Sequence, residues 1–164
     1  MTQCAVIGAG AWGTALADVL ACNGHDVSLW ALEADVVAAV NESHSNPRFL
    51  AGFTLAPTLR ATTSLSDVLA GASLVCVATP AQHLRSVLRS ARASLAPHAI
   101  MNVASKGIEG ETLSLMSDIV AEEAPEHDVV ALSGPSFAAE VAARQPTAIV
   151  AASNSLPPRR CRRR

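Results

Sequence analysis

A glycine-rich turn between a short apolar run and a helical stretch constrains this chain more than any other feature. Residues 4–7 read Cys-Ala-Val-Ile, and residues 8–13 read Gly-Ala-Gly-Ala-Trp-Gly. A chain that leaves a buried strand, turns at once and enters a helix close to the sheet needs positions without a Cβ. The first-turn N–H groups of a helix beginning near Ala11 have no partners within the helix and favour an anion such as a pyrophosphate. The turn therefore predicts an anion site.

An acidic residue supports a dinucleotide as the occupant of this site. Glu33 lies twenty residues beyond the last glycine of the turn, at the end of a second predicted strand. A carboxylate at this place can accept hydrogen bonds from a ribose hydroxyl. A tight turn with no ligand would account for the glycines but not for Glu33. We therefore predict a dinucleotide site.

Length and composition exclude several classes of protein. The 164 residues suit one domain with a sizeable core. Half of the residues are apolar, yet no run approaches the ~20 residues that span a bilayer, so we predict a soluble, cytoplasmic protein with no membrane span. The four cysteines form no Cys-x-x-Cys pair, and Cys4 and Cys76 fall inside predicted strands. Neither a disulfide framework nor a metal site is predicted.

The charge is unevenly distributed. Five of the 12 basic residues are arginines among the last six positions, which leaves seven basic against 14 acidic residues before them. An acidic body argues against nucleic acid as a partner. Because the arginines follow a Ser-Leu-Pro-Pro break at residues 155–158, we predict that residues 153–164 form an unstructured tail, with nonspecific polyanion binding as the alternative.

Apolar runs alternate with helical patterns along the rest of the chain. Strands are predicted at residues 4–7, 26–30, 59–61, 74–78, 100–103, 129–132 and 148–151. Helices are predicted at residues 12–23, 34–41, 65–70, 82–94, 112–123 and 136–143. This order is typical of an α/β fold, with a doubly wound, mostly parallel sheet covered by helices on both faces. Residues 43–57 break the alternation, and we interpret them as a long loop with one turn of helix at most, over a ligand or against a missing partner domain.

Ligands of such sheets bind beyond the carboxyl ends of the strands, so the residues after each strand are the candidates for function. Thr79 and Pro80 follow the fourth predicted strand, where Thr79 either caps a helix or forms a wall beside a ribose. His83 is interpreted as a surface residue.

The only lysine of the chain, Lys106, follows the fifth predicted strand. A single mobile ammonium beside Gly107, at the carboxyl end of a strand, indicates a ligand contact, with a solvated surface lysine as the alternative. Glu109 and Glu111 are close enough in sequence to neutralise Lys106. As loop residues, we expect them to be exposed.

A second helix start is predicted after the sixth strand, in the sequence Ser133-Gly134-Pro135-Ser136. Pro135 suits the first helical position, with Ser133 or Gly134 as the cap. The free N–H groups of that helix would face the same crevice. The alternative is a well-started helix with no ligand.

Five ordered segments carry a family resemblance: residues 8–17, 46–50, 79–83, 105–109 and 133–138. Together they resemble the cofactor domain of bacterial NAD(P)-dependent glycerol-3-phosphate dehydrogenases. The resemblance covers residues 3 to 152, which are predicted to be a Rossmann-type dinucleotide-binding domain, and it stops beyond Ser153. In this family a C-terminal helical domain, absent here, supplies the catalytic lysine, so no catalytic residue is predicted in this chain.

The resemblance implies specific contacts. The predicted cofactor-binding residues are Gly8, Gly10, Ala11, Trp12, Gly13, Glu33, Pro80, Lys106 and Ala138. The predicted substrate-binding residues are Lys106, Gly134 and Ser136, and no metal ligand is predicted. Leu32 stands where the family often has a basic residue or histidine, so a preference for NADP over NAD is in doubt.

The resemblance also implies a reaction. The complete enzyme would interconvert dihydroxyacetone phosphate and sn-glycerol 3-phosphate with NAD or NADP, for phospholipid synthesis, and the chain alone would be inactive. Its partner would be a phosphorylated three-carbon molecule, and the apolar edge around Phe49, Phe53 and Phe137 would favour self-association. The alternative is a noncatalytic dinucleotide-binding module that senses redox state or pairs with another chain.

Overall fold

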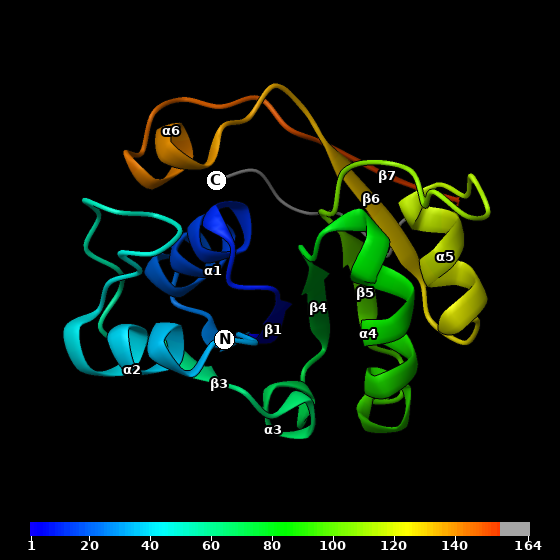
Figure 1. Cartoon of the computed structure of the whole chain (residues 1–164), viewed down its shortest axis with the longest axis horizontal. Coiled ribbons are helices and arrows are strands. Elements are labelled where there is room, and N and C mark those ends of the chain that lie inside the picture. The colour runs from blue at the N-terminus through cyan, green and yellow to red at the C-terminus, as the bar shows by residue number, and fades with distance from the viewer. Residues whose placement is uncertain (155–164) are drawn as a thin grey trace.

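The computed structural model describes residues 1–154, which form one seven-stranded sheet with helices on both faces (Figure 1). The strands lie in the order β3-β2-β1-β4-β5-β6-β7. All neighbours are parallel except β6 and β7, which are antiparallel. Their bounds are β1 Gln3–Ile7, β2 Asp26–Trp30, β3 Arg60–Thr62, β4 Leu74–Val77, β5 Ile100–Val103, β6 Val129–Ser133 and β7 Val150–Ser153. The predicted doubly wound α/β fold is confirmed.

The connections between strands are mostly helical. The α-helices are α1 Ala11–Cys22, α2 Ala34–Ser43, α3 Leu65–Leu69, α4 Leu84–Ala91, α5 Met116–Glu123 and α6 Ala138–Ala142. Short 3₁₀ turns flank α4, η1 at Ala81–His83 and η2 at Arg92–Ser94. The helix predicted over residues 82–94 is thus three successive elements. Its apolar side chains Leu84, Leu88 and Ala91 recur every three to four residues and are buried, as expected for a helix that packs one face on a sheet.

Two apolar clusters lie on opposite faces of the sheet. One holds Leu69, Leu84, Leu88 and Ile119 from α3, α4 and α5. The other packs α1 and α2 with the segment around Leu59 against β1 and β2. Because the central strands are covered on both sides, their sequences are continuously apolar, as in β4 with Leu-Val-Cys-Val. Cys4 and Cys76 are buried within these strands, as predicted, and burial raises the pKa of the Cys76 thiol to about 11.

Two predicted helices begin later than expected. The helix predicted from residue 112 begins at Met116, because residues 108–115 close a small loop through a bridge between Ile108 and Leu115. The helix predicted from residue 136 begins at Ala138. In both cases backbone bonds within a loop replace the expected first helical turn. No helix forms between Ser43 and Arg60, where the chain makes turns and a short bridge from Asn46 to Leu50, in agreement with the predicted long loop.

The last strand reaches one residue past the predicted domain boundary at residue 152. Ser153 belongs to β7, and its hydroxyl donates to the Val129 carbonyl at 2.7 Å. The rest of the predicted tail, residues 155–164, lies outside the described residues. Within residues 1–154, no helix has both the length and the apolar character needed to cross a membrane.

Candidate functional site

A cleft of about 820 Å³ opens at the carboxyl ends of the strands, over the point where the sheet order reverses between β1 and β4. Open α/β sheets bind ligands at this point. Residues from the β1–α1 turn, the end of β2, the β4–η1 connection, the end of β5 and the segment after β6 line it. Eight of the nine predicted cofactor-binding residues line the cleft, and Gly13 is the one that does not. The eight are Gly8, Gly10, Ala11, Trp12, Glu33, Pro80, Lys106 and Ala138.

The three glycines of the turn have different structural roles. Gly8 has φ +113°, and a Cβ there would lie 2.8 Å from the Ala78 carbonyl oxygen of β4. Gly13 is buried beneath the turn, where a Cβ would collide with the Gly8 carbonyl. A Cβ on Gly10 meets nothing within 4 Å. Gly8 and Gly13 are therefore required by packing, whereas the space beside Gly10 is open for a ligand.

The turn leaves the start of α1 uncapped. Gly10 is the N-cap and has no side chain to accept from the first-turn N–H groups. Those groups carry the positive end of the helix dipole, so the start of α1 is a suitable place for a phosphate pair.

Asn46 fastens the long loop beneath this turn, a role that the sequence reasoning missed. Its Nδ2 donates to the Ala9 carbonyl at 2.9 Å and to Thr14 Oγ1 at 2.8 Å, and its Oδ1 accepts from the Phe49 N–H at 3.1 Å. Asn46 is fully buried. The loop thereby brings Phe49 to the cleft. The signal available in the sequence is segment 46–50 itself, which contributes to the family resemblance but does not by itself indicate this role.

The rim beside β2 is acidic and apolar. Glu33 lines it as the N-cap residue of α2, and Leu32 is 76% exposed there. The nearest arginine in the loop, Arg48, pairs with Asp35 at 3.3 Å and lies 5.3 Å from the Phe49 ring centre.

Two polar atoms of the cleft wall have no hydrogen-bond partner within the described residues: Trp12 Nε1 and Thr79 Oγ1. Thr79 is buried and does not cap the following turn, whose N-cap is Pro80. The capping interpretation of Thr79 is therefore wrong, and the wall interpretation agrees with its place in the cleft. Buried donors and acceptors are rarely left unpaired, so both atoms fit contacts to a ligand. His83 is exposed, as predicted, and also lines the cleft.

Lys106 extends across the cleft from the end of β5. Its Nζ lies 5.6 Å from the centre of the Trp12 ring and 3.5 Å from the Gly134 carbonyl oxygen. The described residues provide no carboxylate partner for it. An ammonium held by an aromatic face and one carbonyl keeps its charge available to an anionic ligand.

The segment after β6 differs from its prediction. Gly134 has φ +144° and the Ser136 N–H donates to the Gly134 carbonyl at 2.9 Å, so Pro135 is not the first residue of a helix. The predicted start at Pro135 is wrong, because α6 begins three residues later, at Ala138, with Phe137 as its N-cap. Phe137 and Ala138 both line the cleft, so the start of α6 still lies beside it. Ser136 still lines the cleft, whereas Gly134 contributes its carbonyl to Lys106 and is not part of the lining.

An ion pair holds this segment in place over α1. Arg144 Nη2 donates to the buried Asp18 at 2.7 Å. Asp18 also accepts from the Ala56 N–H at 2.7 Å. This ion pair fixes the segment after β6, which completes the cleft, to α1, the helix that follows the glycine turn. In agreement with this, α6 lies beside α1 (Figure 1).

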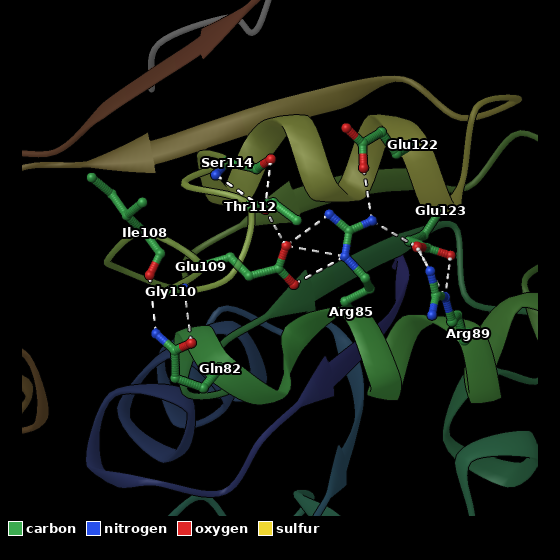
Figure 2. Close-up of polar contacts among 10 residues, drawn as sticks. All are labelled: Gln82, Arg85, Arg89, Ile108, Glu109, Gly110, Thr112, Ser114, Glu122 and Glu123. Carbon is green, nitrogen blue, oxygen red and sulfur yellow. Dashed lines mark hydrogen bonds and ion pairs between the residues drawn. The ribbon is translucent and has the colours of Figure 1, made fainter.

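Glu109 is buried, which contradicts its predicted exposure. Figure 2 shows its carboxylate turned toward Arg85 on α4. Arg85 also bonds Glu122 at 2.7 Å and Glu123 at 2.8 Å on α5. Hydrogen bonds from Arg85 and Thr112 lower the pKa of Glu109 to about 2. The burial of Glu109 was missed because its partner Arg85 is 24 residues away in sequence.

No group of three or more histidine, cysteine, aspartate or glutamate side chains within residues 1–154 is placed to hold a metal ion. The groups that the cleft offers to a ligand are its glycine turn, the uncapped start of α1, the Lys106 ammonium, and the unpartnered Trp12 Nε1 and Thr79 Oγ1.

The family assignment rests on comparison with known proteins. The model of the family described as NAD-dependent glycerol-3-phosphate dehydrogenase N-terminus matches residues 3–157. The chain belongs to this family. The resemblance inferred from the sequence is confirmed, and the family name identifies NAD as its cofactor.

Individual relatives agree with this assignment. The glycerol-3-phosphate dehydrogenase [NAD(P)+] of Erythrobacter litoralis is 48% identical over 153 residues, which are 93% of this chain and 45% of that protein. The enzyme of the same name from Bacillus cytotoxicus is 44% identical over 159 residues, covering 95% and 47%. The crystal structure of glycerol-3-phosphate dehydrogenase from Coxiella burnetii has a TM-score of 0.86 and 34% identity, covering 93% of this chain and 46% of that one. The chain thus spans slightly less than half the length of these relatives.

Proposed function

We propose that this chain is the cofactor-binding part of an enzyme that reduces dihydroxyacetone phosphate to sn-glycerol 3-phosphate with NADH or NADPH, for glycerophospholipid synthesis. One observation carries the proposal: the glycine turn, the bare start of α1 and the chain's only lysine face one cleft at the carboxyl ends of the strands. The proposed compartment is the cytoplasm, which agrees with the free thiols of Cys4, Cys22 and Cys76.

The cleft residues fit a nicotinamide dinucleotide. The first turn of α1 would hold the pyrophosphate over Gly10, where no side chain intervenes. Glu33 would accept from a ribose hydroxyl, and the unpartnered Trp12 Nε1 and Thr79 Oγ1 would gain partners. The bound reduced nicotinamide supplies the hydride.

The substrate would be bound at the Lys106 side of the cleft. The Lys106 ammonium would attract a phosphorylated three-carbon molecule and favour negative charge on the carbonyl oxygen of that substrate. Ser136 lines the same part of the cleft and offers a hydroxyl, while Gly134 lies next to the ammonium. Because the sequence has one lysine, we propose that the proton-transferring lysine belongs to the half of the relatives that this chain does not span.

Several apolar groups at the cleft side and along the last strand remain uncovered. Phe137, Ile149 and Val150 are 71%, 53% and 63% exposed. Surfaces of this kind favour association, so we propose self-association of the chain when no second half covers them.

Binding of NADH tests the proposal. We expect NADH to bind the wild-type chain and the Gly10→Val variant to lose at least tenfold in affinity, about 1.4 kcal/mol, because the valine fills the space over the helix start. Gly10 has φ −63° and ψ 177°, which a valine adopts without strain. Loss of affinity would therefore report the ligand site and not misfolding.

The measurement is calorimetric titration with NADH, and Ala121→Val on the exposed face of α5 is the matched control. No heat with the wild type, or equal affinity in Gly10→Val, would contradict the proposal.

A further inference from the structure

We propose that Gln82, Arg85 and Glu109 are positioning residues that fix where the Lys106 ammonium lies in the cleft. These three residues and Thr112 are called the brace below. The functional meaning of the brace rests on the proposed function, whereas its geometry and the test below do not.

The chain just before Lys106 is anchored to the end of β4. The N–H groups of Ala104 and Ser105 both donate to the Val77 carbonyl, at 2.8 and 2.9 Å. The Ser105 hydroxyl donates to the Thr79 carbonyl at 2.7 Å. One side of Lys106 is therefore fixed by the strand that passes under the cleft.

The chain just after Lys106 is anchored to the segment that continues from β4. The Gln82 side chain makes two bonds to it (Figure 2): Nε2 donates to the Ile108 carbonyl, and Oε1 accepts from the Gly110 N–H, each at 3.0 Å. Lys106 and Gly107 thus bridge two anchored points, both of them on residues 77–82. Gln82 is itself exposed and does not line the cleft, so these bonds are its main structural contribution.

Arg85 holds the middle of the loop. Its Nε and Nη2 each lie 2.9 Å from a Glu109 carboxylate oxygen, a two-point contact that fixes orientation as well as distance. The side chains of Arg85 and Glu109 are only 18% and 10% exposed. Thr112 donates to the same carboxylate, and the Glu109 N–H donates to the Ser114 carbonyl at 3.1 Å. Residues 109–114 are thus joined to one another by hydrogen bonds, and Arg85 joins this loop to α4.

The brace also separates Glu109 from Lys106. The two residues are three apart in sequence, and a free carboxylate in this loop would compete with an anionic ligand for the ammonium. In the structure Arg85 binds that carboxylate, and Lys106 points the other way, toward Trp12 and Gly134. The brace therefore supplies both the placement and the free charge of the ammonium.

The composition of the chain allows a direct test. Reductive methylation with ¹³C-formaldehyde labels only amines, and Lys106 and the N-terminus are the only amines in the 164 residues. The dimethylated lysine keeps its positive charge. Because its nitrogen lies 5.6 Å from the centre of the Trp12 ring, we expect its methyl ¹³C–¹H signal to be shifted upfield from that of free dimethyl-lysine. The variant Trp12→Leu identifies the part of the shift that the ring causes.

The variants Glu109→Ala and Gln82→Ala are expected to lose at least half of that upfield shift. Arg89→Ala is the matched control: it removes an ion pair to Glu123 one turn further along α4 without touching the loop, and it is expected to keep the shift. Far-UV circular dichroism verifies that each variant is folded. Should Glu109→Ala fail to fold, the exposed Gln82 still gives a variant that decides the question.

A full shift in folded Gln82→Ala and Glu109→Ala, or no upfield shift in the wild type, would overturn the positioning role. The sample contains no cofactor, so the outcome is independent of the proposed function. Titration of the same samples with NADH separates the two: a shift that depends on the brace, without any NADH binding, would reject the proposed function and leave the positioning role standing.

Discussion

At the scale of single residues, Lys106 combines features that surface lysines do not share. It follows a central strand, faces an aromatic ring and has no carboxylate partner within the described residues. An ammonium preorganised in this way stabilises negative charge that develops on a substrate oxygen.

We expect Lys106→Ala to lower kcat/KM by about a hundredfold, or ~3 kcal/mol, in a full-length enzyme made by joining this chain to the second half of a relative. Lys106→Arg is expected to restore little, because the planar guanidinium requires a different geometry. Steady-state kinetics beside the NADH dissociation constant measure both effects. Near-normal kcat/KM in both variants would identify Lys106 as a solvated surface residue.

We expect the pair Leu32 and Glu33 to determine which dinucleotide binds at the rim of the cleft. Glu33 suits a ribose hydroxyl and repels a 2′-phosphate, and Leu32 adds no positive charge. Arg48, the arginine of the neighbouring loop, is already paired with Asp35. We therefore expect NADH to bind at least as well as NADPH.

The variant Leu32→Arg is expected to improve NADPH binding about tenfold, or 1.4 kcal/mol, and to leave NADH affinity within about twofold. Leu32 is largely exposed, so the change places a cation at the rim without disturbing the core. Titration with both nucleotides measures the ratio, and Leu32→Gln controls for the loss of the leucine. A tenfold preference of the wild type for NADPH would show that another cation binds the 2′-phosphate.

At the scale of elements, the sequence predicts the strands and helices that depend on a local pattern of residues. It does not predict the contacts that depend on residues far away in the sequence. The strands β1, β2, β4 and β5 and the start of α1 follow from apolar runs and the glycine turn. The start of α6 was misplaced because Pro135 and Ser136 suit a helix start locally, whereas Gly134 packs against the segment just before β7: a Cβ there would lie 2.5 Å from the Ala148 carbonyl oxygen. Glu109 and Asn46 were missed for the same reason, since their partners are more than 20 residues away.

The brace between the β5–α5 loop and α4 gives the molecule an acid-sensitive element. Hydrogen bonds from Arg85 and Thr112 lower the pKa of Glu109 from 4.5 to about 2. Burial raises the pKa of Glu123, but hydrogen bonds from Arg89 and Arg85 outweigh it and leave that pKa lowered. A carboxylate with a depressed pKa contributes stability above its ordinary pKa and loses it as the pH falls toward the folded value.

We therefore expect the wild type to be more heat-stable than Glu109→Ala above about pH 5. The difference in Tm is expected to shrink as the pH falls from about 4.5 toward 2. Thermal unfolding across this range measures it, and Asp35→Ala, which breaks the exposed pair with Arg48, is the control with a small effect at every pH. A Tm difference that stays constant down to about pH 2 would contradict the assigned pKa of Glu109.

At the scale of the whole molecule, the sheet is complete enough to fold around its own two cores but presents an uncovered side. The residues of β7 are exposed along their whole length, and those of β6 are only partly buried. A parallel strand such as β6 is normally covered on both faces. The uncovered side agrees with relatives that are about twice as long as this chain.

Turnover by the 164-residue chain distinguishes the cofactor part of an enzyme from a self-sufficient catalyst. The cleft supplies a cofactor site and one ammonium, and reduction of a ketone also requires a proton donor beside the substrate oxygen. We propose that Lys106 holds the substrate, and the sequence has no second lysine. We expect the chain to bind NADH yet to oxidise it with dihydroxyacetone phosphate at less than about a thousandth of the full-length rate, because loss of the proton donor costs about 10²–10⁴-fold and loss of substrate contacts adds to it.

The absorbance of NADH at 340 nm follows the reaction, and a fusion of this chain to the second half of a relative is the positive control. Turnover by the fusion, with no turnover by the chain alone, would place the missing proton donor in the added half. Turnover of the chain alone within tenfold of the fusion would mean that a residue of this cleft donates the proton, and Ser136, whose hydroxyl faces the same cleft as Lys106, would then be the first residue to replace. NADH binding without turnover even in the fusion would favour a dinucleotide-binding module over an enzyme.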